Sequence, residues 1–125
     1  MTRERFEQIA QEAFDSLPPD FTDRVENVQI VVEDYPSDDA LGKAKADRHS
    51  LLGFYQGIPL TQRGQWYGMS ATVPDKITLY QKNIEAVCKD EEEMELRITE
   101  VLFHELGHYF GMDERQIRNA MRRFL

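Results

Sequence analysis

The sequence has a single cysteine and no long apolar run, and these absences limit where the protein can work. Cys88 has no partner for an internal disulfide, which is usual for proteins of reducing compartments. No run approaches the roughly 20 apolar residues that span a bilayer. The first residues, MTRERFEQIAQE, are charged where a secretory signal would be apolar. We therefore expect a cytoplasmic protein with no membrane partner.

Positive charge is also scarce, because 15 Lys and Arg residues stand against 23 Asp and Glu residues, giving a net charge of -8. Proteins that bind nucleic acids neutralise phosphates with clustered Lys and Arg side chains. The composition therefore predicts no nucleic-acid partner. With 125 residues, of which 41% are hydrophobic, the chain suffices for one domain with its own core. We expect this domain to span residues 1–125.

Hydrophobic spacing predicts a helix near the N-terminus and a small sheet in the middle of the chain. Residues 3–16 place apolar side chains at helical spacing, and Pro18 ends the pattern. In KITLYQ apolar and polar residues alternate from Ile77 to Tyr80, which predicts a strand with one buried face. Residues 36–50 are predicted to form a polar loop. The three strand candidates are VQIVVEDY (28–35), LLGFYQGIPL (51–60) and KITLYQ (76–81).

From residue 91 the hydrophobic period is helical, and it continues to Phe110. Asp90 and Glu93 form a predicted capping box at the start, and Gly111 supplies a left-handed stop. Apolar residues cover most of the circumference, which predicts a central, buried helix. A last helix is predicted over ERQIRNAMRRFL (114–125). The predicted fold class is therefore α+β, with a short mixed sheet between helices. The polar sector of the buried helix holds Arg97, Glu100, His104 and His108.

The buried helix carries the segment HELGH, which has the HExxH spacing of metal-dependent hydrolases. Histidines at positions i and i+4 lie on one helix face about 6 Å apart, a separation that lets two imidazoles bind one zinc ion. The pair is His104 and His108. Glu105 projects about 100° from His104, which places it beside a water on the same metal. This position suits a general base.

A catalytic zinc site needs a third protein ligand and an open position for water. Gly111 lets the chain turn back below the two histidines, so that Asp113 or Glu114 can supply a carboxylate. The spacing HExxHxxGxxE selects Glu114, and Asp113 is also placed to cap the last helix together with Gln116. We therefore predict Glu114 as the third ligand and keep Asp113 as the alternative. His49 is the only other imidazole, and it is predicted to be solvated.

The chain resembles a family of small bacterial zincin-like proteins, called minimal zincins and described as zinc metallopeptidases. The family signature HExxHxxGxxD on a buried helix follows segments like LLGFYQGIPLTQR (51–63) and DKITLYQKNI (75–84), which occur here in the same order. The resemblance covers about residues 50–120. It implies an α+β fold in which zinc is bound by His104, His108 and the acidic position at Glu114. This chain has Glu where the family has Asp.

The sequence thus predicts a zinc-dependent metallopeptidase that hydrolyses peptide or protein substrates with Glu105 as the general base. The strand KITLYQ is predicted to pair with the extended substrate. Tyr80 and Tyr67 are the candidate substrate-binding residues. Tyr55 and Arg63 are further candidate donors to the developing oxyanion. The alternative is a zinc-binding regulatory or interaction domain of the same fold without peptidase turnover.

Overall fold

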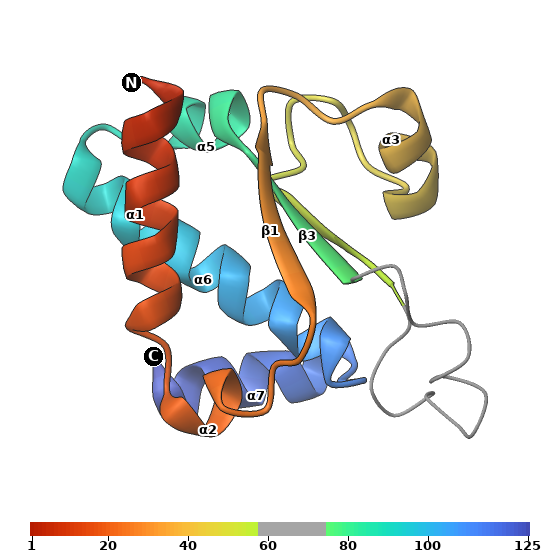
Figure 1. Ribbon diagram of the computed structural model, residues 1–125. Helices are drawn as coiled ribbons and strands as arrows, with labels where there is room; N and C mark the ends of the chain where they lie inside the picture. The colour runs from red at the N-terminus through yellow and green to blue at the C-terminus, as the bar shows by residue number, and fades with distance from the viewer. Residues whose placement is uncertain (58–74) are drawn as a thin grey trace.

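The computed structural model describes residues 1–57 and 75–125 and shows an α+β fold, which confirms the predicted fold class (Figure 1). No helix within these ranges is long and apolar enough to cross a membrane. In chain order the elements are α1 (Arg3–Asp15), α2 (Pro19–Thr22), β1 (Val28–Glu33), α3 (Asp38–Ala44), β2 (Gly53–Gln56), β3 (Asp75–Tyr80), α5 (Gln81–Val87), α6 (Glu91–Tyr109) and α7 (Glu114–Phe124).

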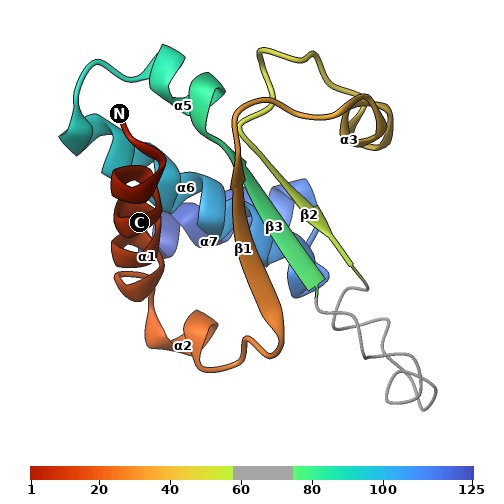
Figure 2. The ribbon, with the colours of Figure 1, turned by 45° about the horizontal axis from the view of Figure 1, so that its top comes forward.

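The described strands form one mixed sheet in the order β1-β3-β2 (Figure 2). β1 lies parallel to β3, with Ile30 opposite Ile77, and β2 lies antiparallel to β3, with Phe54 opposite Thr78. The prediction of one buried face for β3 is wrong, because all four residues from Ile77 to Tyr80 are at most 2% exposed. As the central strand, β3 is covered on both faces, so even its polar residues are buried.

Helix α6 lies between α1 and the sheet, as the prediction of a central, buried helix requires (Figure 1). Phe6 and Ile9 of α1 belong to the same hydrophobic cluster as Ile77 and Leu79 of β3. Burial of each large apolar side chain contributes about 1.5–3 kcal/mol, so this cluster fixes the position of α6 firmly. The buried apolar side chains that α6 supplies are Met94, Ile98, Val101, Leu102, Phe103, Leu106 and Tyr109.

Local hydrogen bonds explain both ends of α6. At the start, the Asp90 side chain accepts from the N–H of Glu93 at 2.8 Å. The Glu93 carboxylate accepts from the N–H of Lys89, not from that of Asp90, so the predicted capping box is only half formed. At the end, Gly111 has a φ of 81°. The N–H groups of Gly111 and Met112 donate to the carbonyls of His108 and Gly107. This Schellman arrangement reverses the chain toward α7.

Within the described residues, three helices were not predicted, and two of them can be traced to capping chemistry. Pro19 occupies the first turn of α2, where proline is tolerated. The two prolines therefore begin α2 as well as end the pattern of α1. Ser37 accepts from the N–H of Ala40 at 3.1 Å and begins α3 within the predicted polar loop. α5 follows β3 directly, and the buried side chain of Asn83 donates to two carbonyls, those of Arg48 and Leu51.

Gly53 lets β2 approach α6 closely, and its replacement is expected to destabilise the protein. A Cβ at this position would lie 2.5 Å from Cγ1 of Val101 and 3.2 Å from the carbonyl oxygen of Thr78. Gly53→Ala should therefore lower the free energy of unfolding by about 1–3 kcal/mol, measured by urea denaturation.

Gly42→Ala is the matched control, because nothing lies within 4 Å of the added Cβ. Gly42 is in α3, so alanine should be neutral or stabilise by up to about 1 kcal/mol. Equal stabilities of the Gly53 and Gly42 variants would contradict the close approach of strand and helix.

Candidate metal centre

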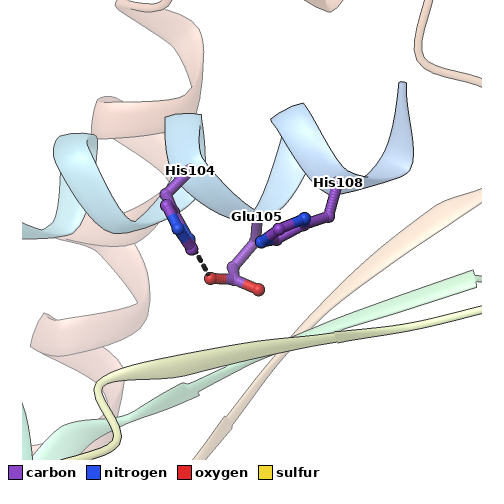
Figure 3. Close-up of side chains that lie close together, drawn as sticks. All are labelled: His104, Glu105 and His108. Carbon is purple, nitrogen blue, oxygen red and sulfur yellow. Dashed lines mark hydrogen bonds and ion pairs between the residues drawn. The ribbon is translucent and has the colours of Figure 1, made fainter. Parts of the chain in front are cut away.

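The histidines of HELGH lie one helical turn apart on α6, and their side chains extend from the helix toward the sheet (Figure 3). The ring centroids of His104 and His108 are 4.7 Å apart and the rings are nearly perpendicular. Each side chain is about one third exposed, at 34% and 33%. The ligand atoms of His104, Glu105 and His108 all lie within 4.8 Å of one another. A metal ion could therefore contact more than one of them.

Glu105 is nearly buried, at 6% exposed, and both of its carboxylate oxygens have partners. Oε2 lies 2.6 Å from Nδ1 of His104, the contact drawn in Figure 3. Oε1 accepts a hydrogen bond of 2.9 Å from the backbone N–H of Tyr55 in β2. The carboxylate therefore connects the helix to the neighbouring strand and holds one imidazole from its Nδ1 side.

Glu114 contacts the opposite side of the same imidazoles. Its Oε2 lies 2.9 Å from Nε2 of His104, and its Oε1 lies 2.9 Å from Nε2 of His108. Because Gly111 reverses the chain after α6, the first residue of α7 comes to lie below the histidine pair. Both Nε2 atoms therefore point to one carboxylate, although ten residues separate His104 from Glu114 in the sequence.

Asp113 has a different role in the structure. Its side chain accepts from the N–H of Gln116 at 2.8 Å, and the Gln116 side chain accepts from the N–H of Asp113 at 2.8 Å. This reciprocal pair is the capping box of α7 that the sequence predicts, and it is confirmed.

The two carboxylates strongly favour the protonated form of His104. The hydrogen bond to Glu105 is the largest cause, and together with Glu114 it raises the pKa of His104 to about 9 against the opposing effect of burial. The same contacts lower the pKa of Glu114, chiefly through its hydrogen bond to His104. Because a metal replaces protons on its ligands, an ion at the Nε2 atoms would compete with this proton.

The chemistry of the donors fits a divalent transition metal. Two imidazole nitrogens directed at one carboxylate form the ligand set of two histidines and one acid that hydrolytic metal sites use. The Nδ1 of His104 already has a carboxylate partner, and such a partner fixes the orientation of a metal-binding imidazole. His104, His108 and Glu114 can therefore bind the ion, with Glu105 beside it.

A pocket of about 560 Å³ opens directly over these residues. It is lined by all four of His104, Glu105, His108 and Glu114. Residues of β2, Leu51 of the segment before it, and Met112 also line the pocket. The large apolar and aromatic residues that line the pocket are Leu51, Phe54, Tyr55 and Met112. A ligand in this pocket would contact both the histidine pair and the strand.

Residues 25–123 match the family described as zincin-like metallopeptidase. The chain belongs to this family. A solved structure of a conserved hypothetical protein from T. thermophilus has the same fold, with a TM-score of 0.55 and 22% identity over 88% of this chain and 94% of the other. No curated protein matches the sequence at a significant level.

For a zincin-like metallopeptidase, the placement of the predicted substrate-binding residues matters. Tyr80 is 2% exposed at the end of β3 and is absent from the lining of the 560 Å³ pocket. Its burial, with added repulsion from Glu33, raises the pKa of its hydroxyl to about 12. A direct contact between Tyr80 and substrate thus has no support from its position. Tyr67 and Arg63 lie outside the described residues.

Tyr55 and His49 are both in the described part of the chain. The Tyr55 hydroxyl donates to Oδ2 of Asp75 at 2.8 Å, and its ring packs edge-on against Tyr109. The side chain is thereby tethered, and it is the backbone N–H of Tyr55 that reaches Glu105. His49 packs edge-on against Tyr35 and is not part of the cluster formed by His104, Glu105 and His108.

The prediction that KITLYQ pairs with the extended substrate is wrong, because β3 is already paired on both sides, with β1 and with β2. Within the described strands, β2 is the edge strand next to the histidine pair. The N–H of Tyr80 in β3 donates to the carbonyl of Leu52, so Leu52, directly before β2, directs its carbonyl toward β3. Alternate residues of an antiparallel strand direct their backbone groups to the same side. Gly53 and Tyr55 therefore direct theirs away from β3, on the side where Tyr55 meets Glu105.

Proposed function

We propose that the protein is a zinc-dependent peptidase that cleaves extended peptides held between α6 and β2. One observation carries the proposal: the Nε2 atoms of His104 and His108 meet a single carboxylate, that of Glu114, at 2.9 Å. Two imidazole nitrogens and one carboxylate that converge in this way are suited to a divalent cation, which replaces the proton on His104. The family assignment of residues 25–123 supports the same activity.

His104, His108 and Glu114 would hold the metal. Two histidines and one carboxylate on an HExxH helix favour zinc over iron. Zinc, when bound, polarises the substrate carbonyl and makes a water molecule more acidic. The Nδ1–H of His104 donates to Glu105, which keeps its Nε2 directed at Glu114 and fixes the orientation of the ring.

Glu105 acts as the general base. Its carboxylate lies in the pocket between the imidazoles and β2, where it takes a proton from the attacking water and later passes it to the leaving amine. The hydrogen bond from the N–H of Tyr55 holds Oε1, so the carboxylate is oriented before substrate arrives. The nearly complete burial of Glu105 limits competing contacts with solvent.

The substrate would add to the sheet along β2. Gly53 directs its backbone groups toward the pocket, and an extended peptide can pair with such groups as an additional antiparallel strand. Such pairing would place one peptide bond of the substrate opposite Glu105 and the histidine pair. Backbone pairing accepts many sequences, so side-chain preference must come from the pocket walls.

The third ligand can be identified by comparing two neighbouring variants. Glu114→Ala removes the carboxylate that meets both Nε2 atoms and should weaken zinc binding strongly, as measured by competition with a chelating dye. Asp113→Ala removes the cap of α7 and should lower the free energy of unfolding by about 1 kcal/mol. The zinc affinity of this second variant should change little. The opposite order of zinc affinities would assign the third ligand to Asp113.

Metal content and cleavage measured on the same samples test the proposed function. Elemental analysis should find one zinc per chain in the native protein and none in His104→Ala. A peptide-library assay should detect cleavage only where zinc is present. Zinc without any cleavage would favour the alternative, a zinc-binding regulatory or interaction domain. A native chain that binds no zinc when it is supplied would overturn both functions.

A further inference from the structure

A second pocket lies beside the metal centre, farther toward the N-terminal end of α6. Its volume is about 290 Å³, and it shares Leu51, Gly53, His104 and Glu105 with the larger pocket. Three further apolar residues, Leu52, Val101 and Met121, help to line it. Arg97 and Glu100 of α6 also line it, and the proposed mechanism uses neither of them. The positive charge of Arg97 in this pocket therefore suggests a role in ligand binding.

Arg97 lies on the same face of α6 as His104, because seven residues make almost two helical turns. The two residues are separated by about 10 Å along the helix axis, at 1.5 Å per residue. An extended peptide advances about 3.4 Å per residue. A group bound by Arg97 would therefore lie two or three residues away from a peptide bond held at the histidine pair.

The guanidinium of Arg97 makes no hydrogen bond or ion pair with any residue in 1–57 or 75–125. By contrast, Arg3 and Arg5 on α1 each pair with a carboxylate, those of Asp34 and Glu91. Arg97 is partly buried, in a chain with a net charge of -8. Its planar fork of N–H donors remains available for a carboxylate from outside the chain.

The direction of β2 decides which part of a substrate would reach Arg97. Gly53 lies against Val101, and Tyr55 contacts Glu105, so β2 and α6 advance in the same direction along the two pockets. The N-terminal end of β2 is therefore the end near Arg97. A peptide that pairs antiparallel with β2 runs the opposite way. Its residues after the scissile bond would approach Arg97.

We propose that Arg97 binds a substrate carboxylate two or three residues beyond the scissile bond, so that the enzyme prefers this acidic group. The proposal rests on the proposed peptidase function. The carboxylate can be the C-terminus of a short peptide or an Asp or Glu side chain, since both offer the same planar pair of oxygens. The apolar walls formed by Leu51, Val101 and Met121 would contact an apolar side chain of the substrate next to this carboxylate.

Glu100 lines the same pocket and opposes the binding of an anion there. It is exposed, so solvent screens its charge. Within the described residues it forms no ion pair with Arg97. Glu100→Gln should therefore strengthen the preference for acidic substrates, the opposite of the effect expected for Arg97→Gln.

Three matched pools of randomised, N-acetylated hexapeptides test the proposal. The first pool ends in a free carboxylate and the second in an amide, and neither contains acidic residues. The third pool also ends in an amide but carries one Glu at the fifth position. Binding to the zinc-loaded Glu105→Gln variant and cleavage by the native protein are both measured by mass spectrometry. The binding measurement needs no turnover, so it tests Arg97 separately from the peptidase function.

We expect the free-acid and Glu pools to bind and react about tenfold better than the plain amide pool, as a charge-assisted hydrogen bond predicts. Arg97→Gln should abolish this preference for acidic peptides, both in cleavage by the single variant and in binding by the double variant with Glu105→Gln. Arg97→Lys should retain part of the preference. Arg24→Gln, an exposed arginine that lines neither pocket, should leave it unchanged. Acid preference in binding without cleavage would support Arg97 and contradict the peptidase.

Two results would overturn the role of Arg97. The first is equal binding of all three pools to the zinc-loaded protein. The second is an acid preference that persists in the Arg97→Gln protein. A preference for the free-acid pool alone would assign the bound group to the peptide C-terminus. A preference for both acidic pools would assign it to carboxylates in general. Native thermal unfolding of Arg97→Gln and unchanged zinc content establish that the variant keeps its fold and metal site.

Discussion

Glu105→Gln should reduce peptide hydrolysis by about 10²–10⁴-fold, because it removes the only proton acceptor assigned to the attacking water. The amide keeps the size of the side chain and can still accept from the N–H of Tyr55. It cannot also accept from the Nδ1–H of His104, because its other terminal atom is a donor. Zinc affinity should therefore fall by no more than about 10–100-fold, the usual effect of losing such an orienting partner.

Hydrolysis should be measured at a zinc concentration that saturates both proteins, with zinc content determined in parallel. Glu95→Gln is the control, since Glu95 is an exposed glutamate on the same helix and lines neither pocket. Its activity should equal that of the native protein. Complete loss of zinc from Glu105→Gln would mean that Glu105 is a ligand and that another residue is the base.

The helices that flank the site could be predicted because their signals are local. The cap at Asp90, the apolar period from Glu91 onward and the stop at Gly111 each depend on residues only a few positions away in the sequence. The structure places α6 at Glu91–Tyr109 and gives Gly111 a φ of 81°. The cap of α7 at Asp113 is equally local, and it also forms as predicted.

The strand order could not be predicted, because it depends on contacts between distant segments. Pairing β3 with both β1 and β2 buries Thr78 and Tyr80, whose alternation with apolar residues suggested an exposed face. The same pairing leaves β2, and not β3, at the edge of the described sheet next to the histidine pair. As a result, β2 replaces KITLYQ as the strand proposed to bind substrate, and Tyr80 lies buried and outside the lining of the 560 Å³ pocket.

In the candidate site, too, the features that depend on local sequence could be predicted, and those that depend on distant segments could not. His104 and His108 follow from helical spacing alone, and the glycine turn accounts for the approach of Glu114. The hydrogen bond from Tyr55 to Glu105 involves a backbone N–H, which has no sequence signature. Arg97 appears in the sequence only as part of a polar helix sector, and its relation to a pocket depends on β2.

Zinc should stabilise the native protein, and His108→Ala should remove this stabilisation. An ion that binds only the folded chain adds about 2.7 kcal/mol when its concentration is 100 times its Kd. For a chain of this size the melting temperature should rise on the order of 10 °C. His108→Ala deletes one of two imidazoles whose Nε2 atoms meet Glu114. If its Kd then exceeds the zinc concentration, less than about 0.4 kcal/mol remains.

The measurement is thermal unfolding with zinc and with a chelator, for the native protein, His108→Ala and His49→Ala. His49→Ala provides the matched control, because the His49 ring contacts Tyr35 and lies outside the histidine cluster of α6. It should retain the full shift in melting temperature. A native melting temperature that does not respond to zinc would contradict a metal site that forms on folding. A shift that persists in His108→Ala and disappears in His49→Ala would place the ion at His49, away from Glu105, and would remove the proposed catalytic arrangement.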